Sequence, residues 1–176
     1  MGLDFDPIEE AARQWRAHWD ERYVPPMKAI TSVMRVQQIW LAQLNEVLAP
    51  FGLTFARYEA LMLLQYSRAG ALPLGKIGAR LQVHPTSVTN LIDGLERDGL
   101  VTREPHPSDG RMTLAQLTAA GREVALRATE ALHAIRFGTE LPDDELERLS
   151  EILRSVRVEA GDFGSSPGGS GRGSDK

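Results

Sequence analysis

The stretch from residue 74 to residue 117 constrains the fold more than any other part of the chain, because helix, turn and strand signals follow one another closely there. A helical period over residues 74–81 places Leu74, Ile77 and Leu81 on one face. A second helix begins at Pro85, and its apolar residues recur at i, i+3, i+4 and i+7: Val88, Leu91, Ile92 and Leu95. Gly99 is suited to end this helix. The stretch therefore predicts two short helices joined by a tight turn.

A β-hairpin is predicted directly after the second helix. Residues 100–103 and 111–117 are typical of short strands, and turn-forming residues 105–110 lie between them. A short helix, a tight turn and a second helix form the helix-turn-helix arrangement, to which the hairpin adds a wing. We therefore predict a mainly α fold with a small β-wing (α+β), in the form of a winged helix-turn-helix.

The rest of the chain is predicted to be helical. We expect helices over residues 7–22, 27–48, 55–67, 119–137 and 142–159, with Pro25 and Pro26 breaking the chain between the first two. This pattern suggests N-terminal dimerisation helices over 1–50, the winged helix-turn-helix over 51–118, C-terminal dimerisation helices over 119–160 and a disordered Gly/Ser-rich tail over 161–176.

Several function classes are excluded by what the sequence lacks. The chain contains no cysteine, which excludes disulfides, thiolate catalysis and cysteine-based zinc sites. The four histidines are scattered without metal-ligand spacing, and no nucleophile–base pair or phosphate-binding loop is present. We therefore expect neither an enzyme nor a bound metal or cofactor. No apolar run approaches 18 residues, so no membrane contact is expected and a cytoplasmic location is the default.

The second helix of the pair has a polar face that suits nucleic acid. Short donors and acceptors of this kind read base edges and bind phosphates. The candidate contacts in and around this helix are His84, Pro85, Thr86, Ser87, Thr89, Asn90 and Arg97, with Lys76 and Arg80 on the preceding helix. In the wing the candidates are Arg103, Asp109, Gly110 and Arg111, because a hairpin can place an arginine in a narrow minor groove.

The net charge of −4 opposes binding to DNA only if it is spread evenly. Residues 23–139 carry twelve Lys and Arg against nine Asp and Glu, whereas residues 1–22 and 140–162 are acidic. The predicted winged region is therefore mildly basic and its flanks are acidic.

A family resemblance lies in the same region. Residues 74–101 read LGKIGARLQVHPTSVTNLIDGLERDGLV, residues 107–111 read PSDGR and residues 117–121 read LTAAG. Together these motifs resemble the MarR (multiple antibiotic resistance regulator) family of transcriptional regulators over roughly residues 30–157. The resemblance implies a homodimer with intertwined N- and C-terminal helices, whose two recognition helices enter successive major grooves of a palindromic double-stranded DNA operator. We expect such a regulator to act as a repressor. The chain departs from the family at His84, Asn90 and Gly110.

A set of aromatic residues leaves two readings open. Trp15, Trp19, Trp40, Tyr58 and Glu59 either line a pocket for a small aromatic or anionic effector that releases the DNA, or the aromatic rings fill a dimer interface. The N-terminal tryptophan helix also resembles that of the urate-responsive branch of the family. Leu91 stands where that branch has a recognition-helix arginine, so urate is not the expected ligand.

The main alternative is a winged-helix module that binds a ligand or a protein and does not bind DNA, since the fold alone does not fix the function. A protein-docking surface should expose large apolar groups. The free face of residues 86–97 is small and polar instead, which favours DNA.

Overall fold

The computed structural model describes residues 3–106 and 109–163, and for Gly110 and Arg111 it describes the backbone only. The chain divides into two compact units, the first ending at Gly138 and the second beginning at Thr139. The first unit therefore includes the helix after the hairpin, which the sequence suggested as part of a separate C-terminal region.

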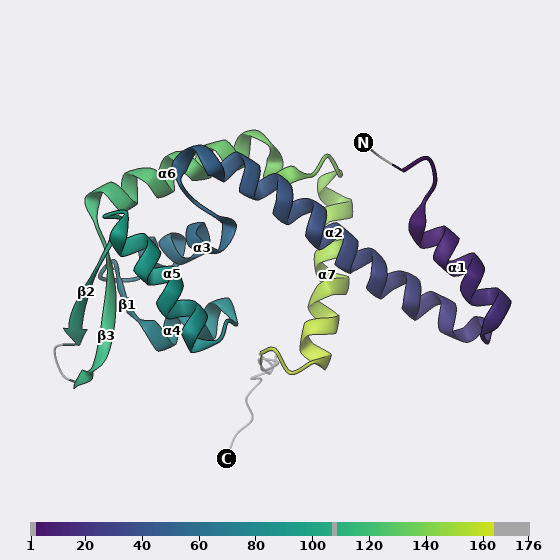
Figure 1. Ribbon diagram of the computed structural model, residues 1–176, viewed down its shortest axis with the longest axis horizontal. Helices are drawn as coiled ribbons and strands as arrows, with labels where there is room; N and C mark the ends of the chain where they lie inside the picture. Colours follow the sequence, from purple (N-terminus) through teal and green to yellow (C-terminus); the bar gives the residue numbers. More distant parts are fainter. Residues whose placement is uncertain (1–2, 107–108, 164–176) are drawn as a thin grey trace, which may run out of the picture. The chain divides into compact units, whose positions relative to one another are not determined.

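The first unit is mostly helical with one small sheet, which confirms the predicted fold class (Figure 1). Its elements are α1 (Pro7–His18), η1 (Glu21–Tyr23), α2 (Val24–Leu48), η2 (Ala49–Phe51), α3 (Phe55–Gln65), β1 (Ala71–Pro73), α4 (Leu74–Leu81), α5 (Pro85–Arg97), β2 (Val101–His106), β3 (Asp109–Leu117), α6 (Ala119–Ala134) and η3 (Arg136–Gly138). The second unit contains α7 (Asp143–Glu159).

The sheet is antiparallel with the order β1-β3-β2. Val101 pairs with Leu117 and Arg103 pairs with Ala115, so β2 and β3 form the predicted hairpin. The strand β1 was not predicted, because three residues that end in a proline carry no periodic signal. It lies at the edge of the sheet, where Pro73 does not interrupt a central hydrogen-bond ladder.

The core lies where α3 meets the helix-turn-helix, the sheet and α6. Leu61 and Leu64 of α3, Ile92 and Leu95 of α5, and Leu132 of α6 are all fully buried in this one cluster. Burying each such side chain contributes about 1.5–3 kcal/mol relative to leaving it in water. One face of α5 is therefore held firmly against the core.

A close approach joins the hairpin to α6. Thr118 caps α6: its hydroxyl accepts a hydrogen bond from the Gly121 N–H at 2.9 Å and donates to the Gly99 carbonyl oxygen at 2.8 Å. The buried Gly121 lies so close to the backbone of Leu100 that a Cβ there would overlap the Leu100 carbonyl oxygen. The LTAAG motif is therefore a helix start fitted against the end of the α5–β2 turn.

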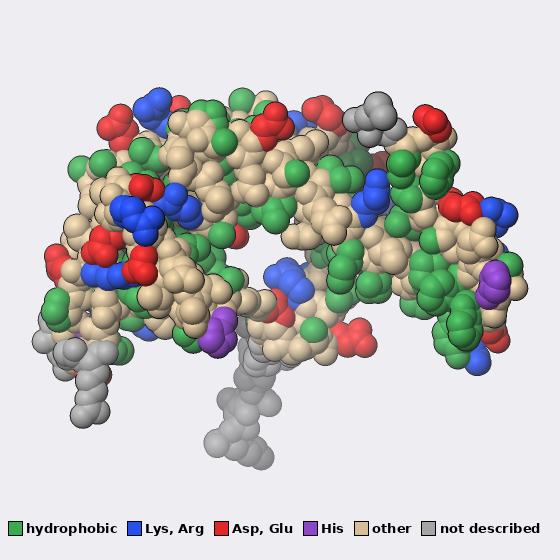
Figure 2. All heavy atoms as spheres, in the orientation of Figure 1, with side chains coloured by type: hydrophobic (Ala, Val, Ile, Leu, Met, Phe, Trp, Pro, Cys, Tyr) green, Lys and Arg blue, Asp and Glu red, His purple; other side chains and the backbone are tan. Residues whose placement is uncertain are grey.

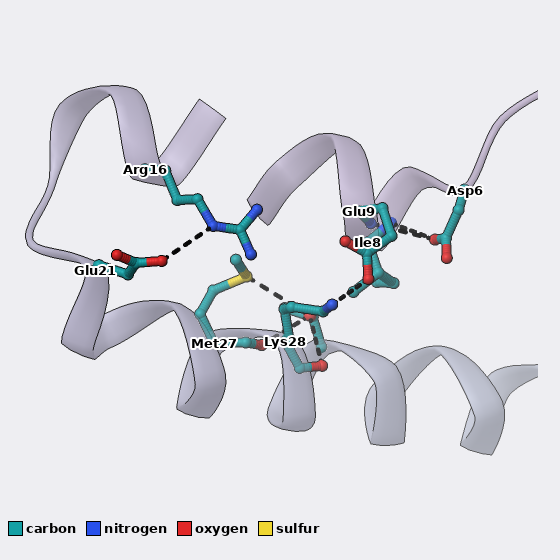
Figure 3. Close-up of polar contacts among 8 residues, drawn as sticks. Asp6, Ile8, Glu9, Arg16, Glu21, Met27 and Lys28 are labelled. Carbon is teal, nitrogen blue, oxygen red and sulfur yellow. Dashed lines mark hydrogen bonds and ion pairs between the residues drawn. The ribbon is translucent and has the colours of Figure 1, made fainter. Parts of the chain in front are cut away.

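The predicted break at Pro25 and Pro26 is wrong, because both prolines lie inside the first turn of α2. The first residues of a helix have no intrahelical acceptor for their N–H groups, so proline fits there. The chain turns instead after His18, and α1 folds back on α2 (Figure 3). Glu9 pairs with Lys28, and Arg16 pairs with Glu21 at 3.8 Å. Asp6 caps α1 by accepting from the Ile8 N–H at 2.8 Å.

Much of the apolar surface of α2 is exposed. α2 lies along α6 towards its C-terminal end and along α1 towards its N-terminal end (Figure 1). Ile30, Val33, Met34 and Ile39 each expose about half of their surface, at 57%, 48%, 63% and 47%. No single helix in the described part of the chain is long and apolar enough to cross a membrane; α2 and α3 reach that measure only as a pair bent by 69°.

Over residues 139–163, the described part of the second unit, the one helix is α7, which has an acidic first turn at Asp143, Asp144 and Glu145. None of the α7 side chains, all of which the structure describes, is buried. Phe163 follows the helix, and the guanidinium groups of Arg154 and Arg157 in α7 lie over its ring, each 5.3 Å from the ring centroid. Residues 161–163 of the predicted disordered tail therefore have defined contacts, and residues 164–176 lie outside the described residues.

Candidate nucleic-acid interface

Helix α5 has one buried face and one exposed face. Val88, Ile92 and Leu95 point into the core. The residues predicted to contact DNA all lie on exposed positions of the helix or its cap: His84, Pro85, Thr86, Ser87, Thr89, Asn90 and Arg97. Gly78 of α4 sets the distance between the two helices, because a Cβ there would come within 2.9 Å of Val88 Cγ2.

The N-terminus of α5 is capped by a histidine. His84 Nδ1 accepts a hydrogen bond from the Thr86 N–H at 3.3 Å, which requires that this nitrogen carry no proton. Three residues after Thr86, the Thr89 hydroxyl donates to the Pro85 carbonyl oxygen at 3.2 Å. The first turn of α5 is thus ordered by its own side chains and leaves Thr86, Ser87 and Asn90 exposed.

Helix α4 adds two exposed cations, Lys76 and Arg80. Its C-cap, Gln82, adopts a left-handed conformation with φ +53°, which makes the turn into α5 tight. Between the two helices is a hollow of about 450 Å³ lined mainly by apolar groups, among them Leu74, Val83 and Val88. The cations and the exposed face of α5 are therefore built on one compact helix-turn-helix.

The wing is only partly described. Asp109 begins β3, whereas the Arg111 side chain and all of residues 107–108 lie outside the described residues. Arg103, predicted as a wing contact, faces α5 instead of the loop. Its guanidinium pairs with Asp93, lies 3.4 Å from Glu96 and donates to the Thr89 carbonyl oxygen at 3.2 Å.

Sequence reasoning missed a second arginine at α5. Arg57 of α3 pairs with Asp98, the C-cap of α5, and donates to the Gly52 carbonyl oxygen at 2.8 Å. Arg57 and Asp98 are 41 residues apart in the chain, so no local pattern links them. Only a signal that pairs distant positions would have identified this contact.

The five residues of the predicted effector pocket are not brought together within one chain. The Trp15 and Trp19 rings of α1 lie 6.3 Å apart, beside the start of α2. Trp40 lies twelve residues beyond Lys28 on α2, about 18 Å along the helix axis at the usual rise of about 1.5 Å per residue. Tyr58 belongs to the core, where its hydroxyl is 3.0 Å from the Thr129 hydroxyl.

Burial raises the pKa of the remaining pocket residue, Glu59 of α3. A carboxyl whose pKa is higher in the folded chain stabilises the fold fully below its unfolded pKa. That contribution is lost as the pH rises through the pKa that the carboxyl has in the folded chain.

We expect Glu59→Gln to raise the Tm at about pH 7.5 and to leave it nearly unchanged at about pH 4. Glu46→Gln, at an exposed position of α2, controls for the removal of one charge. An equal gain at both pH values would contradict the burial effect.

A helix-turn-helix with a three-stranded sheet and a β-wing defines the winged-helix class of DNA-binding proteins. The MarR family model matches residues 53–113. The MarR-family transcriptional regulator Sco5413 from Streptomyces coelicolor is 53% identical, with a TM-score of 0.76, and the alignment covers 81% of this chain and 99% of Sco5413. The chain therefore belongs to the MarR family, whose members are transcriptional regulators and not enzymes.

Two further relatives are also transcriptional regulators. The HTH-type transcriptional regulator YhbI of Bacillus subtilis is 35% identical over 115 residues, which cover 64% of this chain and 73% of YhbI. Sco3205, a MarR-family regulator from Streptomyces coelicolor whose structure contains DNA, is 25% identical with a TM-score of 0.66, covering 78% of this chain and 87% of Sco3205.

Proposed function

We propose that this regulator binds a palindromic operator as a homodimer and represses transcription there. The observation that carries the proposal is the two-sided character of α5, whose apolar face is buried while its short polar side chains are exposed. The DNA in the Sco3205 complex supports the same use of the fold. The rival module that docks a protein would need an exposed apolar face on this helix.

In this proposal the exposed residues divide into two roles. Asn90 is placed to bond an adenine edge in the major groove, which is a bidentate contact that carries sequence preference. Lys76 and Arg80 contact phosphates, together with Arg97, and these contacts add affinity without sequence preference. Arg111 enters the neighbouring minor groove with Asp109 orienting it, which favours a narrow A·T-rich flank.

The experiment that tests DNA binding is selection of bound duplexes from a random pool, followed by titration of the selected duplex. We expect a palindrome with half-sites one helical turn apart, about 34–36 Å between recognition helices. Affinity should fall steeply between about 50 and 200 mM salt, because phosphate contacts release counterions. An affinity that does not change with salt, or selection of no duplex, would contradict the proposal.

Exposed apolar side chains on α1, α2 and α7 support the homodimer, because a second chain could cover them in place of water. The exposed apolar side chains of α1 and α2 include Trp15, Trp19, Ile30, Val33 and Met34, and α7 exposes Ile152 and Val156. Scattered exposed apolar residues are ordinary, but a contiguous run along one helix marks an interface. We expect sedimentation to give two chains per particle at micromolar concentration, and removal of residues 1–24 to weaken that association. A monomer at that concentration would contradict the proposal.

We also propose that binding represses transcription and that a small aromatic or anionic effector releases the DNA. Support for the effector is the exposed Trp15–Trp19 pair, which a second chain would have to complete into a pocket. A reporter placed behind the selected operator should be silenced by the regulator. Adding phenolic acids to the same duplex titration should then weaken binding, and no change with any of them would exclude this class of effector.

A further inference from the structure

The C-terminal half of helix α5 carries more negative than positive side chains, which opposes its approach to DNA. Its C-terminal half and its cap contain three acids, Asp93, Glu96 and Asp98, against one cation, Arg97. Carboxylates near phosphates repel them and would lower affinity. Figure 2 shows Lys and Arg side chains next to Asp and Glu side chains over this part of the surface.

All three acids are paired with arginines from other elements. Arg103 of β2 contacts both Asp93 and Glu96, and also binds the Thr89 carbonyl oxygen inside α5. Arg57 of α3 contacts Asp98 at the opposite end of this helical segment and the Gly52 carbonyl oxygen behind it. The two arginines therefore hold α5 from two sides.

The arginine side chains are largely withdrawn from solvent. The side chains of Arg103 and Arg57 are 25% and 21% exposed, and the Nε atom of each is buried without an acceptor among the residues that the structure describes. An arginine whose side chain is buried in this way cannot move its guanidinium to a phosphate without breaking its ion pairs with the acids. Breaking such a pair by removing one partner leaves an uncompensated charge, which costs more than removing both partners.

We propose that Arg103 and Arg57 are positioning residues for DNA binding: they neutralise the acidic half of α5 and fix its orientation without touching the DNA. This inference rests on the proposed DNA-binding function. It replaces the sequence-based role of Arg103 as a direct wing contact. The two arginines then act through Asp93, Glu96 and Asp98, and their effect should disappear when those acids are removed.

The test is a thermodynamic cycle on the selected duplex. The four proteins are the wild type, Arg103→Gln, the double variant Asp93→Asn with Glu96→Gln, and the combination of all three changes. In the wild-type background, loss of Arg103 should weaken binding about ten-fold. In the background without the two acids, the same loss should weaken binding less than about three-fold. In the background without the two acids, the salt dependence of binding should be the same with and without Arg103, because no carboxylate near the DNA is then left to be neutralised.

Two results would overturn the proposal. One is an equal loss of affinity in both backgrounds; the other is a salt slope reduced by about one on removal of Arg103 in the background without the two acids, which marks a direct phosphate contact. Failure of the wild type to bind any duplex would instead contradict the proposed function. The matched control is Arg97→Gln, which removes an exposed arginine of the same helix and should lower the salt slope in both backgrounds.

A parallel pair of variants tests Arg57. Arg57→Gln should weaken DNA binding, and adding Asp98→Asn should restore most of the affinity. Thermal unfolding identifies any variant that does not fold. Arg103→Lys then serves as the second variant, because lysine keeps the charge but makes a single point contact. It should fold and bind more tightly than Arg103→Gln, and binding no tighter than Arg103→Gln would contradict neutralisation by this side chain.

Discussion

Replacing Gly121 with alanine is expected to lower the free energy of unfolding by about 3 kcal/mol or more, because the added methyl group has no space. A Cβ at this position would overlap the Leu100 carbonyl oxygen and come within 2.9 Å of both the Leu100 carbonyl carbon and Leu117 Cδ1. Backbone atoms cannot move aside as the end of a flexible side chain can. The first turn of α6 would have to separate from the α5–β2 turn, and the Thr118 bonds to Gly99 and Leu100 would be lost with it.

Chemical denaturation with circular dichroism measures this loss. The matched control is Gly75→Ala, because a Cβ at Gly75 in α4 meets no atom within 4 Å. Alanine is favoured over glycine in helices, so this control should be neutral or stabilising by up to about 1 kcal/mol. If Gly121→Ala unfolds at the same denaturant concentration as the wild type, the close approach of α6 to Leu100 is wrong.

Replacing Thr86 with glutamate is expected to abolish DNA binding while leaving the fold intact. Thr86 is exposed in the first turn of α5, where a negative side chain favours the helix by about 0.3–1 kcal/mol. The same carboxylate would face phosphates in the proposed complex, and a like-charge contact at an interface costs several kcal/mol. At about 1.4 kcal/mol per ten-fold, this cost corresponds to a loss of affinity of about 100-fold or more.

Titration of the selected duplex and thermal unfolding separate the two effects. Ala120→Glu is the control, since it adds the same charge to the first turn of α6 at an exposed position outside the proposed interface. This control should keep the fold and most of the affinity. If Thr86→Glu still binds the duplex, the N-terminal turn of α5 is not part of the DNA interface.

Local pattern was enough for the helix-turn-helix. Residues 74–81 and the start at Pro85 match α4 and α5, because the apolar period and the turn signals lie within a few residues of one another. The fold class and the family followed from the same stretch. Local pattern misjudged Pro25 and Pro26, since a proline pair reads equally as a break or as a helix start, and the neighbouring α1–α2 packing decides between them.

The sequence by itself determined that α5 has a buried apolar face and an exposed polar face, because side-chain period and helix geometry are both local properties. Only the tertiary structure decided where the arginines act. Arg103 faces α5 because the pleat of β2 directs it there, and Arg57 reaches Asp98 because α3 packs behind α5. The tertiary structure also separated Trp15 and Trp19 from Tyr58, since contacts between distant residues depend on how whole elements pack, which no short window of sequence records.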